Sequence, residues 1–147
     1  MNRRGFTFIE MMTVIVLMGI IAAFGIPRLR GALEKQNVRN SKAAIATLVA
    51  TARSVAVQRG CASTLNLNAD SVWVTACGVN PPAASVVVGT KKFVASTYGV
   101  RLSPSAATIG YDPRGISTMF QTTVVGVIGP MYRDSVVINQ VGKVVRQ

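Results

Sequence analysis

The sequence predicts an α+β protein in which a long N-terminal helix packs on a head made of an antiparallel β-sheet. Residues 6–26 form an apolar run with one charged side chain, Glu10, and apolar residues then recur mostly at spacings of three and four as far as Gly60, the spacing of a helix. From Cys61 onward, short segments rich in valine and threonine alternate with Gly, Pro, Asn and Asp, which is typical of antiparallel strands. A chain of 147 residues has room for one membrane-spanning helix and one small domain.

The apolar run has the length of a helix that crosses a bilayer. About 20 apolar residues are required, and residues 6–27 provide them after a short basic leader, residues 1–5. A secretory signal is the alternative, but its apolar region is shorter, and no small-residue cleavage site follows Ala22 and Ala23. We therefore predict a membrane-spanning helix over residues 6–27.

Three features of this segment together resemble the leader of prepilin-type proteins: Gly5 before Phe6, Glu10 four residues after that Phe, and Pro27 at the end of the apolar run. The resemblance implies that a prepilin peptidase cuts after Gly5 and N-methylates Phe6. It also implies that the helix joins a filament in which Glu10 meets the cationic amino terminus of an adjacent subunit. A lone carboxylate needs such a partner, because it costs about 2.5–3.5 kcal/mol at the centre of a bilayer.

Residues 28–60 are predicted to continue the helix as an amphipathic segment that packs on the head. Pro27 is expected to kink or locally melt the helix without ending it, and Gly60 is expected to cap its C-terminus. The predicted apolar stripe consists of Leu29, Leu33, Ile45, Leu48, Val49, Ala52, Val55 and Ala56. Residues 61–147 then form the β-rich globular head that covers this stripe.

The first hairpin of the head is predicted around a turn at residues 68–70, between strands 64–67 and 71–75. In this register Leu65 faces Trp73, and we expect Trp73 to lie in the core. The same register sets Cys61 opposite Cys77, and the Cα atoms of directly opposed antiparallel residues lie within reach of a disulfide. An exported head favours that bond, and two free, buried thiols are the alternative.

Two later segments resemble the paired blocks of strand, turn and glycine near the end of GspH/FimT heads. They are residues 107–118 (ATIGYDPRGIST) and 134–147 (DSVVINQVGKVVRQ). Residues 112–115 and 139–142 have the composition of tight turns, because Gly115 and Gly142 accept a positive φ. Other strands are predicted over residues 85–88, 93–95, 100–102, 108–111, 117–123 and 135–138.

The composition argues against an enzyme. Histidine is absent, so the commonest general base and transition-metal ligand are missing. The five carboxylates are scattered along the chain, and we find no CxxC pair, P-loop or nucleophile elbow. We expect no cofactor and no metal. The carboxylates are Glu10, Glu34, Asp70, Asp112 and Asp134.

The two resemblances imply a minor pseudopilin or minor pilin with a pilin-like fold. Such a subunit has a prepilin peptidase, the inner membrane and other filament subunits as partners, and it enters a type II secretion pseudopilus or a type IV pilus. We expect a single-pass inner-membrane protein with a periplasmic head. The basic residues that closely follow the span predict the opposite orientation, but the leader and the cysteines favour the periplasm.

DNA uptake is the alternative function. The net charge is +11, with 16 basic and 5 acidic residues, and such a charge favours anionic partners. The resemblance to FimT heads points to a C-terminal glycine and basic cluster, here Gly142, Lys143 and Arg146. Tyr111 or Tyr132 would be available to stack on bases. The candidate DNA-binding residues are Lys143, Arg146, Arg114, Arg133 and Arg101.

Overall fold

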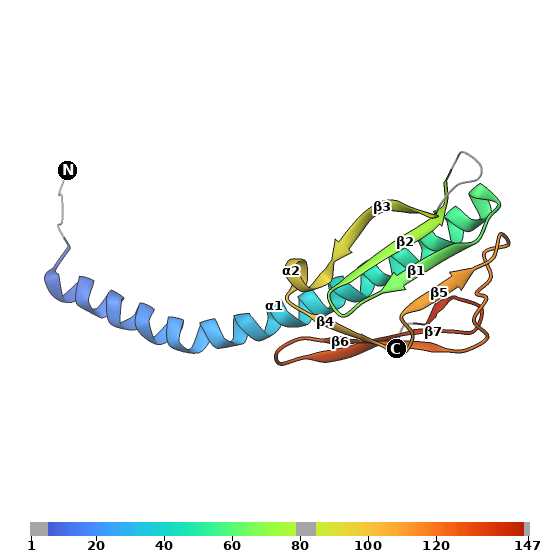
Figure 1. Ribbon diagram of the computed structural model, residues 1–147. Coiled ribbons are helices and arrows are strands. Elements are labelled where there is room, and N and C mark those ends of the chain that lie inside the picture. The colour runs from blue at the N-terminus through green and yellow to red at the C-terminus, as the bar shows by residue number, and fades with distance from the viewer. Residues whose placement is uncertain (1–5, 79–84, 146–147) are drawn as a thin grey trace. The chain divides into compact units, whose positions relative to one another are not determined.

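The computed structural model describes residues 6–78 and 85–145. A 52-residue helix, α1 (Phe8–Arg59), is followed by two antiparallel four-stranded sheets and a short helix, α2 (Val94–Tyr98) (Figure 1). The predicted α+β fold, with a long apolar N-terminal helix and an antiparallel head, is confirmed. The chain divides by its contacts into two compact units, Met1–Leu33 and Glu34–Gln147.

Helix α1 runs through Pro27 and ends where predicted. Proline removes one backbone donor, but the helix continues on both sides of it. Gly60 follows the last helical residue with a φ of 63°, the left-handed conformation that suits a helix end. Burial begins only at Val38, so Leu29 and Leu33, which we expected in the buried stripe, are exposed.

The eight strands of the described residues form two sheets. The first has the order β3-β2-β1-β5, with β1 (Ser63–Leu67), β2 (Ser71–Cys77), β3 (Ser85–Phe93) and β5 (Thr108–Tyr111). The second has the order β4-β6-β7-β8, with β4 (Arg101–Pro104), β6 (Thr123–Ile128), β7 (Arg133–Ile138) and β8 (Val144–Val145).

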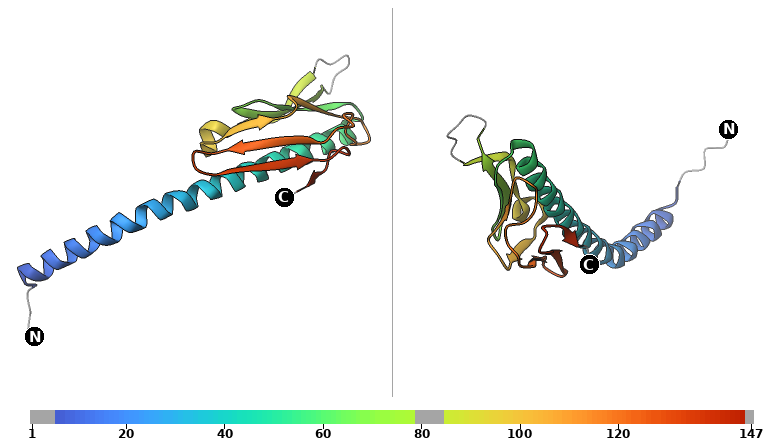
Figure 2. Two further views of the ribbon diagram at one scale, coloured as in Figure 1. Left: turned by 90° about the horizontal axis from the view of Figure 1, so that it is seen from below. Right: turned by 90° about the vertical axis from the view of Figure 1, so that its right-hand side faces the viewer.

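The core lies between the second half of α1 and the two sheets. Figure 2 shows strands of both sheets beside this part of the helix. Its buried side chains, from Val38 to Ala56, pack with residues of β1, β2 and β5 and of β4, β6 and β7. Tyr111 is the largest fully buried side chain of the described residues. One contiguous cluster therefore holds the head to the helix.

The β1–β2 hairpin has a register one residue away from the predicted one. Leu65 pairs with Val74 and Leu67 with Val72, because this register places the leucines of β1 and the valines of β2 on the buried face. The hairpin closes with a bond from the Asn68 N–H to the Ser71 carbonyl, at 2.9 Å. Trp73 consequently lies on the other face, where it is half-buried, so its predicted place in the core is wrong.

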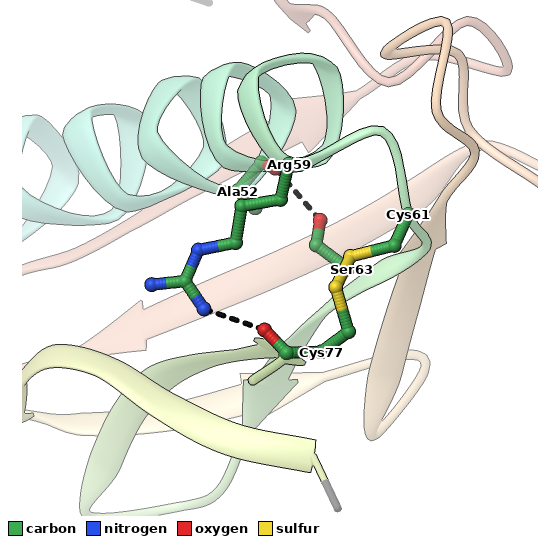
Figure 3. The surroundings of a disulfide bond; sticks show 5 residues. All are labelled: Ala52, Arg59, Cys61, Ser63 and Cys77. Atoms are coloured by element: carbon green, nitrogen blue, oxygen red, sulfur yellow. Dashed lines mark hydrogen bonds between the residues drawn. A yellow bond between two sulfur atoms is a disulfide. The ribbon is translucent and has the colours of Figure 1, made fainter. Parts of the chain in front are cut away.

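Cys61 and Cys77 nevertheless form the predicted disulfide, with Cα atoms 6.3 Å apart. Cys61 precedes β1, so it is not the ladder partner of Cys77 that the predicted register made it. Two hydrogen bonds tie the same region to the end of α1 (Figure 3): Arg59 Nη1 donates to the Cys77 carbonyl at 2.6 Å, and Ser63 Oγ donates to the Ala52 carbonyl at 2.7 Å. The end of the helix is thereby fixed to both strands of the hairpin.

Two other strand predictions are wrong. The predicted strand over residues 93–95 instead starts α2 at Val94, whose N–H donates to the Asp70 carbonyl at 2.9 Å. The predicted strand over residues 117–123 is irregular, and β6 begins only at Thr123. There Ser117 Oγ bonds both the N–H and the carbonyl of Met119, at 3.2 Å each. Such local side-chain bonds compete with a strand ladder.

Candidate functional site

The N-terminus of α1 places Glu10 in the first helical turn. Its N–H donates to Thr7 Oγ1 at 3.3 Å, as in a helix N-cap. A carboxylate in the first turn also interacts favourably with the helix dipole. Glu10 therefore has a local role that our sequence analysis missed, although the spacing of Thr7 and Glu10 is the signature of a capping box. Phe6 and Glu10 are exposed, and Gly5 lies outside the described residues.

The first half of α1 has an apolar surface that is exposed in the described part of the chain. Sixteen of the exposed large apolar side chains lie between Phe6 and Leu33. This part of the helix is long and apolar enough to cross a membrane. An exposed apolar surface of this extent is typical of a membrane segment or a protein interface.

In the head, the first predicted turn is a compact loop held by Asp112. Asp112 Oδ1 accepts hydrogen bonds from the N–H groups of Arg114 and Ile116, at 3.0 and 2.8 Å. Gly115 has a φ of 76°, and its N–H donates to the Asp112 carbonyl at 2.8 Å. Arg53 Nε on α1 donates to the Gly115 carbonyl at 2.9 Å. The turn is thus held against the helix.

The second turn repeats the first. Asn139 Oδ1 accepts from the Lys143 N–H at 2.7 Å, and Gly142, with a φ of 80°, donates its N–H to the Asn139 carbonyl at 2.8 Å. Tyr111 lies against Gly142 and donates a weak 3.4 Å bond to its carbonyl. Burial raises the pKa of Tyr111 to about 12, an effect that Arg53 partly opposes. Tyr111 therefore remains a neutral donor.

Three adjoining open hollows, of about 420, 310 and 410 Å³, lie along α1 from Arg39 to Gln58. We call them together the basic furrow. Neighbouring hollows share lining residues: Ala46 and Val144 for the first two, and Ala50 and Arg53 for the last two. The only carboxylate among the described lining residues is Asp134. The basic lining residues are Arg39, Lys42, Arg53, Arg114 and Lys143.

Asp134 already has partners within the head. Its Oδ2 accepts a 2.6 Å bond from Lys42 Nζ, and its Oδ1 accepts one from the Ser135 N–H at 2.8 Å. Desolvation alone would raise the pKa of Asp134, but these bonds and the charges of Lys42 and Arg39 outweigh it and hold the pKa below its ordinary value of 3.8. Asp134 is therefore ionised at neutral pH and leaves the furrow with an excess of positive charge.

The structure brings only some of the predicted basic residues together. Arg114 and Lys143 line adjoining hollows next to Arg53, a residue that our sequence analysis did not single out because its partner, the Gly115 carbonyl, is 62 positions away. Arg101 and Arg133 instead pair with Ile128. Ile128 is at one end of β6, and Thr123, at the other end, is the residue nearer to β8. The two ends are five strand positions apart, roughly 17 Å. Arg146 lies outside the described residues.

The two tyrosines differ in what they can contact. Tyr111 is fully buried, so the prediction that it is available for stacking is wrong. Tyr132 is exposed, and Lys35 Nζ lies 5.7 Å from its ring centre. Within residues 6–78 and 85–145, no three His, Cys, Asp or Glu side chains gather into a group able to hold a metal ion.

Comparison with known proteins gives two family matches and two similar structures. The prokaryotic N-terminal methylation motif matches residues 1–26, and the type II transport protein GspH family matches residues 43–142. Crystal structures of the Pseudomonas aeruginosa type IV minor pilin FimU share the fold. One covers 78% of this chain and 90% of its own at 11% identity, with a TM-score of 0.61; another covers 74% and 91% at 11% identity, with a TM-score of 0.56. A search of curated protein sequences gave no match.

The second turn provides a test of the packing beneath the furrow. A Cβ at position 142 would contact the Tyr111 ring and lie 3.1 Å from Ser117 Cβ, at a φ of 80°. We expect Gly142→Ala to lower the free energy of unfolding by about 2–4 kcal/mol, from overpacking and backbone strain together. Denaturant unfolding of the full chain in detergent measures it.

Gly60→Ala is the matched control. Gly60 has a φ of 63°, but a Cβ there meets nothing within 4 Å. The free energy of unfolding of Gly60→Ala should therefore fall by only about 1–2 kcal/mol, from the strain of the left-handed backbone. Equal losses in the two variants would contradict the packing described for Tyr111.

Proposed function

This chain belongs to the GspH family of type II transport proteins, and we propose that it is a minor pseudopilin or minor pilin that assembles into a filament through α1. The filament is a type II secretion pseudopilus or a type IV pilus. The observation that carries the proposal is the uncovered apolar surface of α1 before Val38. We propose a structural role and no catalytic one.

A partner must cover this apolar surface. Burying one large apolar side chain is worth about 1.5–3 kcal/mol, and sixteen are exposed between Phe6 and Leu33. Before assembly, the bilayer would cover them as a single-pass anchor. In a filament, the helices of neighbouring subunits would replace the lipid.

We propose the following division of the chain: residues 1–5 as the leader, 6–27 as the membrane and filament-core helix, 28–60 as the amphipathic helix on the head, and 61–147 as the head. A prepilin peptidase would cut after Gly5 and methylate Phe6, as the match to the N-terminal methylation motif supports. The head would lie in the periplasm, where a disulfide such as Cys61–Cys77 persists.

Glu10 would set the position of the subunit in the filament. Its carboxylate is exposed on the helix surface, and it is costly in an apolar environment unless a cation pairs with it. Processing would create such a cation, the amino group of Phe6. In this proposal the Phe6 amino group of one subunit meets Glu10 of its neighbour.

We expect Glu10→Ala to lower incorporation of the full chain into filaments by about tenfold or more. The variant leaves the amino group of Phe6 without a partner, an unpaired charge in an apolar environment costs more than about 1.4 kcal/mol, and each 1.4 kcal/mol corresponds to a factor of about ten. Immunoblotting of sheared filaments against total membrane protein measures it. Thr7→Ala is the control, because it removes the helix cap at Glu10 but keeps the carboxylate. Normal incorporation of Glu10→Ala would contradict the pairing.

DNA binding by the head is a second candidate function, which the basic furrow favours. The furrow lines up five cations and one carboxylate beside α1, and two of these cations, Arg114 and Lys143, belong to the turns that resemble FimT heads. Cations along a groove contact phosphates without reading base sequence. As a minor pilin, such a subunit would capture DNA for uptake.

If the furrow binds DNA, affinity should be independent of sequence and fall steeply with salt. Replacing both Arg114 and Lys143 with Gln should weaken binding and reduce the slope of log K against log salt by about 2, because each phosphate contact contributes about 0.9. Electrophoretic mobility shift of duplex DNA with the full chain in detergent measures both.

The matched control replaces Arg101 and Arg133, which lie outside the furrow, with Gln. It removes the same charge and should leave the salt slope unchanged. Equal effects of the two double variants would indicate only a general charge effect. If the unaltered chain shows no shift at low ionic strength, DNA binding is excluded as a role for this head.

A further inference from the structure

We propose that the first half of β3, residues 85–88, is a docking edge that accepts an extended, acidic strand from a different filament subunit. The identity of the partner rests on the proposed function, but the binding chemistry does not. Three observations carry the inference: the place of β3 in its sheet, the exposure of its valines, and the charge of the head.

Strand β3 is an edge strand. It pairs with β2 alone among the described strands, and it is the longest of them, with nine residues. Figure 1 shows it at the margin of the sheet, with β2 on one side only. Its other side therefore presents backbone N–H and C=O groups that a further strand can pair with.

The first half of β3 is also unusually apolar for an exposed edge. Val86 and Val87 are adjacent, so their side chains point to opposite faces of the sheet, yet they are 47% and 52% exposed. A strand that covers one core buries only one of the two faces. An added strand would give both valines cross-strand neighbours, which is how sheets gain stability from side chains.

The second half of β3 carries the features that protect edges, and the first half lacks them. Gly89 has a φ of 72°, and the β2–β3 register shifts between Val72 and Val74, so the strand is irregular there. Lys91 Nζ lies over the Trp73 ring at 4.1 Å. Bulges and lysines are common devices that block strand addition. By contrast, residues 85–88 pair regularly with β2.

The other sheet edges of the described residues are poorer candidates. Strand β4 has only four residues, with Arg101 at its start and Pro104 at its end, and proline lacks the N–H that an added strand needs. Strand β8 has two residues and β5 has four. Only β3 offers a regular, apolar run.

The charge of the chain indicates which strand would dock. Residues 34–147 carry 12 basic and 4 acidic side chains, a net charge of 12 − 4 = +8. A second copy brings the same charge and is repelled. Lys92, near the end of β3, is exposed, so a partner strand with carboxylates at its N-terminal end, running antiparallel to β3, would be complementary. The occupant is therefore an acidic strand of another subunit.

A peptide tests the docking chemistry directly. The probe is the fluorescently labelled peptide Glu-Glu-Val-Thr-Val-Thr, and its counterpart has both Glu replaced by Lys; both are titrated into the full chain in detergent and followed by fluorescence anisotropy. We expect the acidic peptide to bind and the basic one not to. Binding should also slow hydrogen exchange of the β3 amides, which a contact with surface charge alone would not do.

Val87→Glu should weaken binding of the acidic peptide by about tenfold or more, because it removes an apolar cross-strand neighbour and places a negative charge beside the peptide's own carboxylates. Val124→Glu is the matched control: Val124 is 41% exposed, but its strand, β6, lies between β4 and β7. It should bind like the unaltered chain. Since both valines are exposed, neither variant should unfold the head, and a thermal unfolding scan verifies this.

The proposal is overturned if the acidic peptide does not bind, if the two peptides bind equally, or if Val87→Glu binds as well as Val124→Glu. It is also overturned if light scattering shows a dimer of the unaltered chain that Val87→Glu abolishes, since the occupant would then be a second copy. The assay needs no filament. Its failure therefore leaves assembly through α1 intact, and a failure of assembly leaves peptide binding intact.

Discussion

The apolar surface of α1 is the constraint on which the rest of the structure depends. It extends over both units of the chain, and its side chains are buried in only one of them. From Val38 onward the chain buries the surface under its own two sheets. Before that residue the surface is exposed, and it needs lipid or other subunits. In the proposed function, one helix therefore serves both as the core of a domain and as the segment that attaches the subunit to the membrane or the filament.

The head is organised around the buried part of this helix. The disulfide and the Arg59 bond fix its last turn to the first hairpin, and Arg53 fixes the Gly115 turn to it. Glu34 Oε1, at the beginning of the unit, accepts a 2.8 Å bond from the Tyr132 N–H and another bond from the Met131 N–H. These contacts leave a basic furrow beside the helix. The positions of the cations in the furrow therefore follow from the contacts that hold the two sheets to α1.

Much of this architecture could be predicted from the sequence, because it depends on patterns that are local. The apolar run, the C-cap at Gly60 and the two glycine turns need only neighbouring residues. The observed register of the β1–β2 hairpin differs from the predicted one by one residue, because residues 68–71 are compatible both with a turn of two central residues and with a turn of three. Burial of Val72 and Val74 decides between them, and that choice moved Trp73 out of the core.

The remaining features depend on contacts between distant residues. Arg53 has its role only because the Gly115 carbonyl is folded against it. Val94 starts a helix where a strand was predicted, because its N–H and that of Ala95 find the Asp70 carbonyl. The separation of Arg101 and Arg133 from Lys143 follows from pairing across β6, and no spacing in the sequence indicates it.

Assembly through Glu10 requires a new, cationic chain end close to that residue, and intact-mass spectrometry of the membrane-extracted protein tests this most directly. In cells that contain a prepilin peptidase, we predict a chain that begins at Phe6 and carries one methyl group on its amino terminus, while cells without the peptidase retain Met1. A chain that retains Met1 in both would contradict assembly by the mechanism described above.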